Sequence, residues 1–194
     1  DCDVSITNDN ISKLLAKGKT LNSFGVLMPK IHKHKYNDLI IGYDEKNKLP
    51  ILSFNTGCVM LFEKKTFLKI GSFDENYFLY FEETDFFTRC IKNNKKIYLY
   101  EKFDVKHVGS RSINLRYKDE YFIFRNWHYC WSKFYYYRKH KNYFIALSKT
   151  FPNFKKSIFG MIKSLILSNP LQFKLRNAEF MGLTRSYLTM KSAH

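Results

Sequence analysis

Residues 77–100 have the sequence YFLYFEETDFFTRCIKNNKKIYLY, and this stretch decides the fold class. An aromatic run over residues 77–81 ends at three carboxylates in four residues, Glu82, Glu83 and Asp85. The apolar residues that follow have the spacing of one helix face: Phe86, Phe87, Cys90 and Ile91. Residues 96–100 then alternate as a β-strand. Because a strand, a helix and a strand follow one another, we predict an α/β domain.

The chain before this stretch contains further elements of both kinds. In chain order we expect a helix capped by Asn8 or Asp9, a strand over residues 24–28 stopped by Pro29, a surface loop or weak hairpin over residues 31–50, an apolar strand over residues 58–62, and a helix over residues 65–70 with Gly71 as its C-cap. These elements extend the predicted α/β domain over residues 1–115.

The last eighty residues differ from the rest in charge. The chain has a formal net charge of +16; residues 116–194 carry 15 Lys/Arg against 3 Asp/Glu, whereas residues 1–115 carry 18 against 14. From Tyr117 the pattern is helical, in three stretches that divide at Pro152 and near Pro170. A basic surface attracts polyanions, either nucleic acid or the anionic leaflet of a membrane. Interleaved aromatic residues suit the lipid headgroup boundary.

The cysteines and the apolar runs restrict the class of protein. Four cysteines, Cys2, Cys58, Cys90 and Cys130, form no C-x-x-C pair, so we expect single buried thiols rather than a zinc site or a disulfide framework. The longest apolar stretch, residues 158–167, contains Lys163 and is too short to span a bilayer.

The acidic cluster is the most informative candidate site. Carboxylates this close repel one another, which raises at least one pKa and makes a usable general base. The first turn of a helix has the opposite effect and favours the ionised form. An acidic N-cap explains the same residues structurally, so the cluster alone leaves both interpretations open.

Two further patterns carry possible ligands for a cation. His107 follows a strand and precedes a Gly/Ser turn, where a side chain is presented to a cleft, although a lone histidine is more often structural. Asp1 and Asp3 are two residues apart, so both can face one cation, and their oxygen atoms suit Mg²⁺ or Mn²⁺. Neither pattern decides the function alone.

Taken together and in order, these segments resemble the second half of family 2 glycosyltransferases, in particular the bacterial rhamnosyltransferase-like group that builds O-antigen and capsule. The resemblance covers residues 1 to about 135. The matching segments are Asn55-Thr56-Gly57-Cys58-Val59-Met60-Leu61-Phe62, residues 70–75, residues 78–86 with Arg89, residues 96–100 continuing to His107, Gly109 and Ser112, and Arg125-Asn126.

The resemblance implies a GT-A (Rossmann-like) fold with a mixed sheet, and it implies roles for individual residues. Asp3 looks like the main metal-binding carboxylate and Asp1 like its variable partner, while His107 looks like the histidine that completes the metal site. Glu83 stands where the family's acidic motif usually has Asp as the base. Glu82 precedes this base and Asp85 follows it. Gly57 is implied to leave room for the donor or acceptor sugar.

The implied reaction is an inverting, metal-dependent sugar transfer from a nucleotide-sugar to a lipid-linked saccharide. A carboxylate, Glu83 by preference, takes the proton from the acceptor hydroxyl, and Mg²⁺ or Mn²⁺ offsets the charge on the departing nucleoside diphosphate. In this fold the nucleotide base and ribose are held upstream of the metal-binding carboxylates. We therefore expect that the 194 residues are the acceptor-side part, roughly the last two-thirds of an enzyme, and that alone they bind sugar nucleotide poorly or not at all.

The basic, aromatic region over residues 116–194 has three interpretations. The structural one is a set of helices packed with a solvated basic face. The functional one is peripheral attachment to the cytoplasmic leaflet, the inner face of the cell membrane, where each cation near an anionic surface contributes about 1 kcal/mol. The third is a nucleic-acid-binding module, which we do not favour because such a groove has no use for Glu82, Glu83 and Asp85. A non-catalytic remnant of a transferase also remains an alternative.

Overall fold

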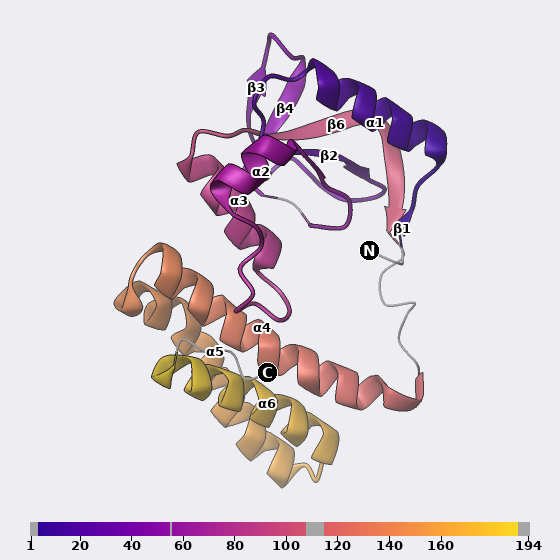
Figure 1. The fold of residues 1–194 in the computed structure, drawn as a ribbon. Helices are drawn as coiled ribbons and strands as arrows, with labels where there is room; N and C mark the ends of the chain where they lie inside the picture. The colour runs from indigo at the N-terminus through magenta and orange to yellow at the C-terminus, as the bar shows by residue number, and fades with distance from the viewer. Residues whose placement is uncertain (1–3, 55, 108–114, 190–194) are drawn as a thin grey trace. The chain divides into compact units, whose positions relative to one another are not determined.

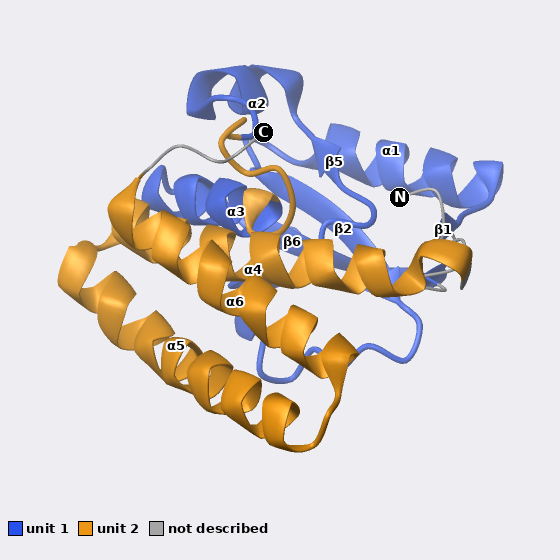
Figure 2. Ribbon diagram, turned by 90° about the horizontal axis from the view of Figure 1, so that it is seen from below, with its two compact units in different colours: residues 1–73, 83–112 blue, residues 74–82, 113–194 orange. Residues whose placement is uncertain are grey.

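The computed structural model describes residues 4–54, 56–107 and 115–189. The chain divides into an α/β unit, residues 1–73 and 83–112, and a helical unit, residues 74–82 and 113–194 (Figure 2). The predicted boundary near residue 115 agrees with the second boundary of these units. Residues 74–82 were predicted to belong to the first part, whereas the structure groups them with the helices.

The α/β unit is built on a mixed sheet. Within the described residues six strands contribute to it: β1 (Val4–Ser5), β2 (Val26–Ile31), β3 (Ile40–Asp44), β4 (Leu49–Leu52), β5 (Leu61–Phe62) and β6 (Ile97–His107). Their order is β3-β4-β6-β2-β5, and β1 pairs with the end of β6 (Figure 1). Strands β2 and β6 run parallel, and the other described pairs are antiparallel. The predicted α/β class is confirmed.

Helices cover both faces of this sheet because β2 and β6 are apolar on both sides. Val26 and Met28 of β2 pack in one cluster with Phe86 and Cys90 of α3 (Glu82–Lys92). The intervening Leu27 joins a second cluster. That second cluster contains Leu14 of α1 (Asn8–Thr20), and α2 (Lys64–Ile70) contributes Phe67 to the first. The predicted helices at 8, 65 and 86 and the C-cap at Gly71 are confirmed.

Three local predictions were wrong. Strand β2 does not stop at Pro29 but continues to Ile31, and its register with β6 shifts directly after Pro29. The shift accommodates a residue that cannot donate to the ladder. Helix α1 is capped by Thr7, whose side chain accepts from the backbone N–H of Asn10, rather than by Asn8 or Asp9. The strand expected over residues 58–62 forms only at Leu61–Phe62.

The helical unit contains α4 (Lys118–His140), α5 (Tyr143–Ile166) and α6 (Pro170–Leu188), preceded by a short 3-10 turn over Leu115–Tyr117. The helix break expected at Pro152 is wrong, because Pro152 lies inside α5 and the chain turns at residues 141–142. Asn142 begins α5 by accepting from the backbone N–H of Ile145. Helices α4 and α6 approach closely at Gly182, whose backbone lies against the carbonyl of Trp127.

Several aromatic residues of α4 lie inside the helical unit. Trp131 and Phe134 are fully buried, Trp131 stacks on Tyr135, and Phe134 contacts the ring of Tyr187 on α6. The structural interpretation therefore holds for this part of the basic region. Among the described residues, no helix is long and apolar enough to cross a membrane.

The predicted buried thiols are confirmed for three of the four cysteines. Cys58, Cys90 and Cys130 are buried and take part in no disulfide bond among the described residues, and Cys2 lies outside these residues. Burial raises the pKa of Cys90 and of Cys130 to about 12. These thiols are therefore protonated and unreactive in the folded chain at neutral pH.

Candidate active site

Two of the predicted site residues, Gly57 and Glu83, lie against one another in the α/β unit. A Cβ atom added to Gly57 would be 3.1 Å from Cβ of Glu83 and 3.2 Å from Cε of Met60. Glu83 lies in the first turn of α3, which fixes its backbone. Any larger residue at position 57 would require a small displacement of its neighbours, so the backbone at Gly57 lies close to the base of the Glu83 side chain.

The residues before Glu83 have an unusual backbone conformation. Tyr80 and Phe81 both have positive φ, 68° and 70°, which side chains other than that of glycine rarely adopt. Strain of this kind persists where the surrounding structure imposes it, and it is frequent at functional sites. The two positive φ angles change the direction of the backbone directly before the carboxylate cluster.

Glu82 has a perturbed carboxyl group. Desolvation by burial raises its pKa, and its Oε2 atom is buried without a hydrogen-bond partner among the described residues. A carboxyl group of this kind holds a proton to higher pH than a solvated one, as expected of a proton-transfer group.

Asp85, the third member of the cluster, has a structural partner. Its carboxylate is fully buried and accepts a hydrogen bond of 2.8 Å from Nε of Arg89, one helical turn later. The rest of the Arg89 guanidinium donates to the three carbonyls of Ile70, Gly71 and Ser72, at 2.7–3.0 Å. Asp85 therefore neutralises the arginine that ties the end of α2 to α3.

Within the helical unit, residues 74–82 are anchored on α4. The Asp74 carboxylate accepts hydrogen bonds from Tyr135 at 2.9 Å and from Lys139 at 2.8 Å, and Ser132 donates to the carbonyl of Leu79 at 2.9 Å. Burial alone would raise the pKa of Asp74, but the hydrogen bonds from Lys139, Asn76 and Tyr135 lower it to about 2.

The strained residues are held by the same helix. Arg125 donates a hydrogen bond to the Tyr80 hydroxyl and lies 5.0 Å from the centroid of its ring. Tyr129 contacts the rings of both Tyr80 and Phe81. Sequence reasoning did not foresee this support. The available signal was the aromatic run over residues 77–81, which requires aromatic partners elsewhere.

The structure locates only part of the predicted metal site. His107 is exposed at the end of β6, and the antiparallel pairing of β1 and β6 puts it opposite Val4, the residue that follows Asp3 in the sequence. Asp1 and Asp3 lie outside the described residues. Within the described ranges no group of three His, Cys, Asp or Glu side chains could hold a metal ion. Of the three predicted metal-site residues, only His107 belongs to the described part of the chain.

Three cavities of about 620, 610 and 530 Å³ are lined by other residues than Gly57, Glu83 and His107. The first and third belong to the helical unit, and the second lies beside the β3–β4 hairpin. Comparison with protein-family models, with curated proteins and with solved structures gives no match for this chain.

Proposed function

We propose that this chain is the acceptor-side part of an inverting glycosyltransferase of family 2, with a GT-A fold, which transfers a sugar such as rhamnose from a nucleotide-sugar to a lipid-linked saccharide. The observation that carries the proposal is the approach of Gly57 to Glu83. Residues 57 and 83 belong to separate segments of the family resemblance, and the resemblance implies that they form one sugar site. A mixed α/β sheet is compatible with such a fold.

In the proposed mechanism Glu83 is the general base. The first turn of α3 favours its ionised form, since the helix dipole is positive there. Its carboxylate takes the proton from an acceptor hydroxyl while that oxygen attacks the anomeric carbon. The bond from this carbon to the diphosphate breaks in the same step, so the configuration inverts. Glu82, whose pKa is raised by burial, is the neighbouring carboxyl group in the sequence.

Gly57 and Asp85 have supporting roles in this proposal. The absence of a side chain at Gly57 leaves space for a sugar beside the base and limits the movement of Glu83. Asp85 positions α3 through Arg89 and does not contact the reacting atoms. The three carboxylates of the cluster therefore have different roles, although they lie within four residues.

A divalent metal, Mg²⁺ or Mn²⁺, is proposed at Asp3 and His107, with Asp1 beside the donor diphosphate. The described residues supply one of these ligands, so no step of the mechanism is derived through the metal. When bound, it would offset negative charge on the departing nucleoside diphosphate.

We place the proposed reaction at the inner face of the cell membrane. A lipid-linked acceptor is held there, and the basic residues of 116–194 are complementary to anionic lipid. The proposed partners are thus a nucleotide-sugar, a lipid-linked saccharide and the membrane surface; nucleic acid is not among them.

The test is a transferase assay with a panel of sugar nucleotides and a lipid-linked acceptor. It compares the 194-residue chain with the longer product that includes any in-frame sequence encoded directly upstream. Glu83→Gln should lower kcat by about 10²–10⁴-fold, while Glu45→Gln, an exposed change in the β3–β4 hairpin, should leave it unaltered. Absence of turnover with every donor, in a folded longer product, would identify the chain as a non-catalytic remnant.

A further inference from the structure

Helix α5 has its small residues inside and its large apolar residues outside. The buried residues of α5 are Ala146, Thr150, Ser157 and Ser164. Several of its largest side chains are exposed instead, with Phe144 80%, Phe159 69% and Ile166 77% exposed. A helix on the surface of a globular protein normally has the opposite arrangement.

The hydroxyls of the inward row of α5 bond to carbonyls of their own helix, and that of Thr150 also lies 3.2 Å from the hydroxyl of Tyr187 on α6. The hydroxyl of Thr150 donates to the carbonyl of Ala146 at 2.8 Å, and that of Ser164 to the carbonyl of Gly160 at 2.6 Å. Ser157 donates to the carbonyl of Phe154 at 2.7 Å. Small residues whose hydroxyls bond to their own helix allow α5 to pack closely within the unit, so its orientation is specified by the sequence.

The outward row is apolar and continuous along the helix. Since seven residues make almost two turns, residues seven or eight apart lie nearly above one another. Phe144, Phe151 and Phe159 follow this spacing, and Ile162 and Ile166 continue the row. Contiguous exposed apolar side chains of this kind mark a surface that another body covers.

A row of lysines runs beside the apolar row. Lys149, Lys156 and Lys163 are seven residues apart and exposed. Lys155 lies along the apolar row itself, with its ammonium 5.4 Å from the ring centroid of Phe151, and its long stem can carry the charge to the edge. From residue 121 to residue 178 the chain has eleven Lys/Arg and no Asp or Glu.

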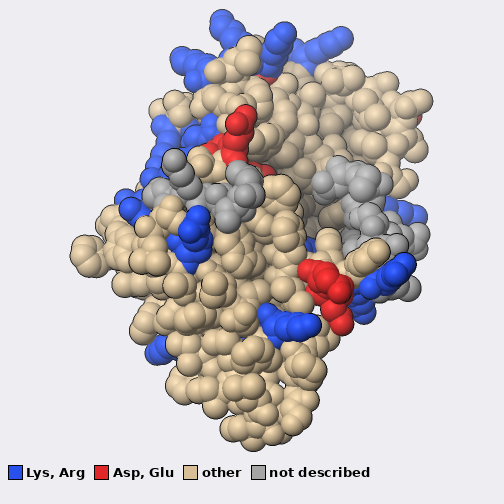
Figure 3. Space-filling model, turned by 60° about the horizontal axis from the view of Figure 1, so that its bottom comes forward, with Lys and Arg blue, Asp and Glu red and all other residues tan. Residues whose placement is uncertain are grey.

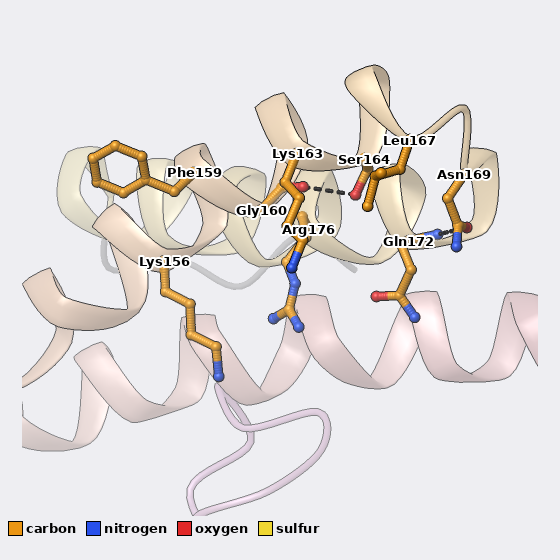
Figure 4. Close-up of a pocket in the computed structure, with 9 residues that line it drawn as sticks. All are labelled: Lys156, Phe159, Gly160, Lys163, Ser164, Leu167, Asn169, Gln172 and Arg176. Carbon is orange, nitrogen blue, oxygen red and sulfur yellow. Dashed lines mark hydrogen bonds between the residues drawn. The ribbon is translucent and has the colours of Figure 1, made fainter.

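A cavity of about 620 Å³ between α5 and α6 adds a site for an anion. It is lined by Lys156, Lys163 and Arg176, with the polar side chains of Asn169 and Gln172. Figure 4 shows the charged ends of the three cations pointing to the same side, with the ring of Phe159 directed away from them. Arg176 also pairs with Glu179 at 2.8 Å, which leaves the two lysines as the main source of positive charge.

We propose that α5 is an in-plane membrane helix: its apolar row inserts into the headgroup–acyl boundary of an anionic bilayer, and the cavity beside it receives a lipid phosphate. The face drawn in Figure 3 carries more Lys and Arg than Asp and Glu, with large areas that carry neither. This inference deepens the peripheral attachment proposed above and rests on it. It does not depend on the transferase chemistry.

Charge favours a membrane over a second copy of the chain as the occupant. A two-fold dimer through α5 would bring the same surface of each copy together. The lysine row would then meet itself, with no carboxylate between residues 121 and 178 to neutralise it. An anionic lipid surface supplies both the apolar phase and the opposite charge.

The test uses vesicles of phosphatidylcholine with and without phosphatidylglycerol. The chain should float with the anionic vesicles, and Phe144→Ser/Phe159→Ser/Ile166→Ser should lower the partition coefficient by at least about 100-fold. Leu68→Ser, which removes an equally exposed leucine from α2, should leave it unchanged. Lys156→Ala/Lys163→Ala should lower it by about 10- to 30-fold, and only for anionic vesicles.

Insertion is read directly from Phe159→Trp. The emission of the introduced indole should shift to the blue on anionic vesicles and be quenched by brominated acyl chains, above the background of Trp127 and Trp131. Full binding of the triple serine variant would overturn the proposal, as would an introduced indole that stays unquenched in bound protein. A blue shift without vesicles, together with a dimer mass, would assign the row to a second copy instead. Because no assay here requires turnover, failure of Glu83 chemistry and failure of membrane binding are distinguishable.

Discussion

A methyl group on Gly57 would lie 3.1 Å from Cβ of Glu83, closer than nine in ten such contacts in proteins. We therefore expect Gly57→Ala to displace the Glu83 side chain. It should lower transferase kcat by about 10-fold or more, since a small misplacement of a catalytic group is costly, with little change in the free energy of unfolding. Gly42→Ala is the matched control, because the nearest atom to its added Cβ is 3.9 Å away. Equal activity of the two variants would contradict the proposed role of Gly57.

The close approach of α4 and α6 at Gly182 predicts a stability effect. A Cβ there would lie 2.4 Å from the carbonyl oxygen of Trp127, so the helices must separate. Gly182→Ala should lower the free energy of unfolding by about 1–3 kcal/mol, measured by urea denaturation. Gly160→Ala should cost less, because its Cβ meets the Arg176 side chain, which can move. The reverse ranking would be inconsistent with the described packing.

Asp74 predicts a dependence of stability on pH. Its pKa is about 2 in the folded chain, below the ordinary value of 3.8. A lowered carboxyl pKa stabilises the fold fully above the unfolded value, and this contribution disappears as pH falls from about 4 toward 2. Asp74→Asn should remove about 1–2 kcal/mol at pH 7 and flatten the acid limb of the stability curve. Unchanged acid unfolding of Asp74→Asn would rule out this role.

The buried cysteines predict low reactivity. At pH 8 Cys90 and Cys130, with pKa values of about 12, carry almost no thiolate. Burial also raises the pKa of Cys58. In a Cys2→Ser background the folded chain should react slowly with a disulfide reagent, and all three thiols should react promptly in denaturant. Rapid labelling under native conditions would indicate that these residues open to solvent.

Features set by neighbouring residues were predictable from the sequence. Helix α3, the buried residues Phe86, Phe87 and Cys90 of its apolar face, and the cap at Gly71 depend on local spacing, and they were identified. Ile91, which was predicted on the same face, is exposed. Features set by distant residues were not. Strand β2 passes through Pro29 because β6 shifts its register there, and α5 passes through Pro152 because its inward row packs in the helical unit. Proline has a local preference for ending a strand or a helix, and at Pro29 and Pro152 the tertiary contacts override this preference.

The candidate site divides in the same way. The spacing of four residues between Asp85 and Arg89 is that of an ion pair on one helix face. From the sequence, however, Asp85 was interpreted as one of the catalytic carboxylates. The approach of Gly57 to Glu83 joins segments 26 residues apart, so no local pattern reveals it. The rows of α5 were visible in principle, since Thr150, Ser157 and Ser164 repeat every seven residues opposite the phenylalanines.

Residues 74–82 interrupt the α/β unit in sequence but take their partners from α4. A chain that ends at residue 112 would therefore lack the helices on which residues 74–82 pack. Tyr77 would lose its contact with the ring of Tyr135, and Phe81 its contact with the ring of Tyr129. Their aromatic side chains would then be exposed on a short loop. The shortened product should aggregate, because residues 74–82 belong to the helical unit, and that unit is completed only when translation has passed the last helix.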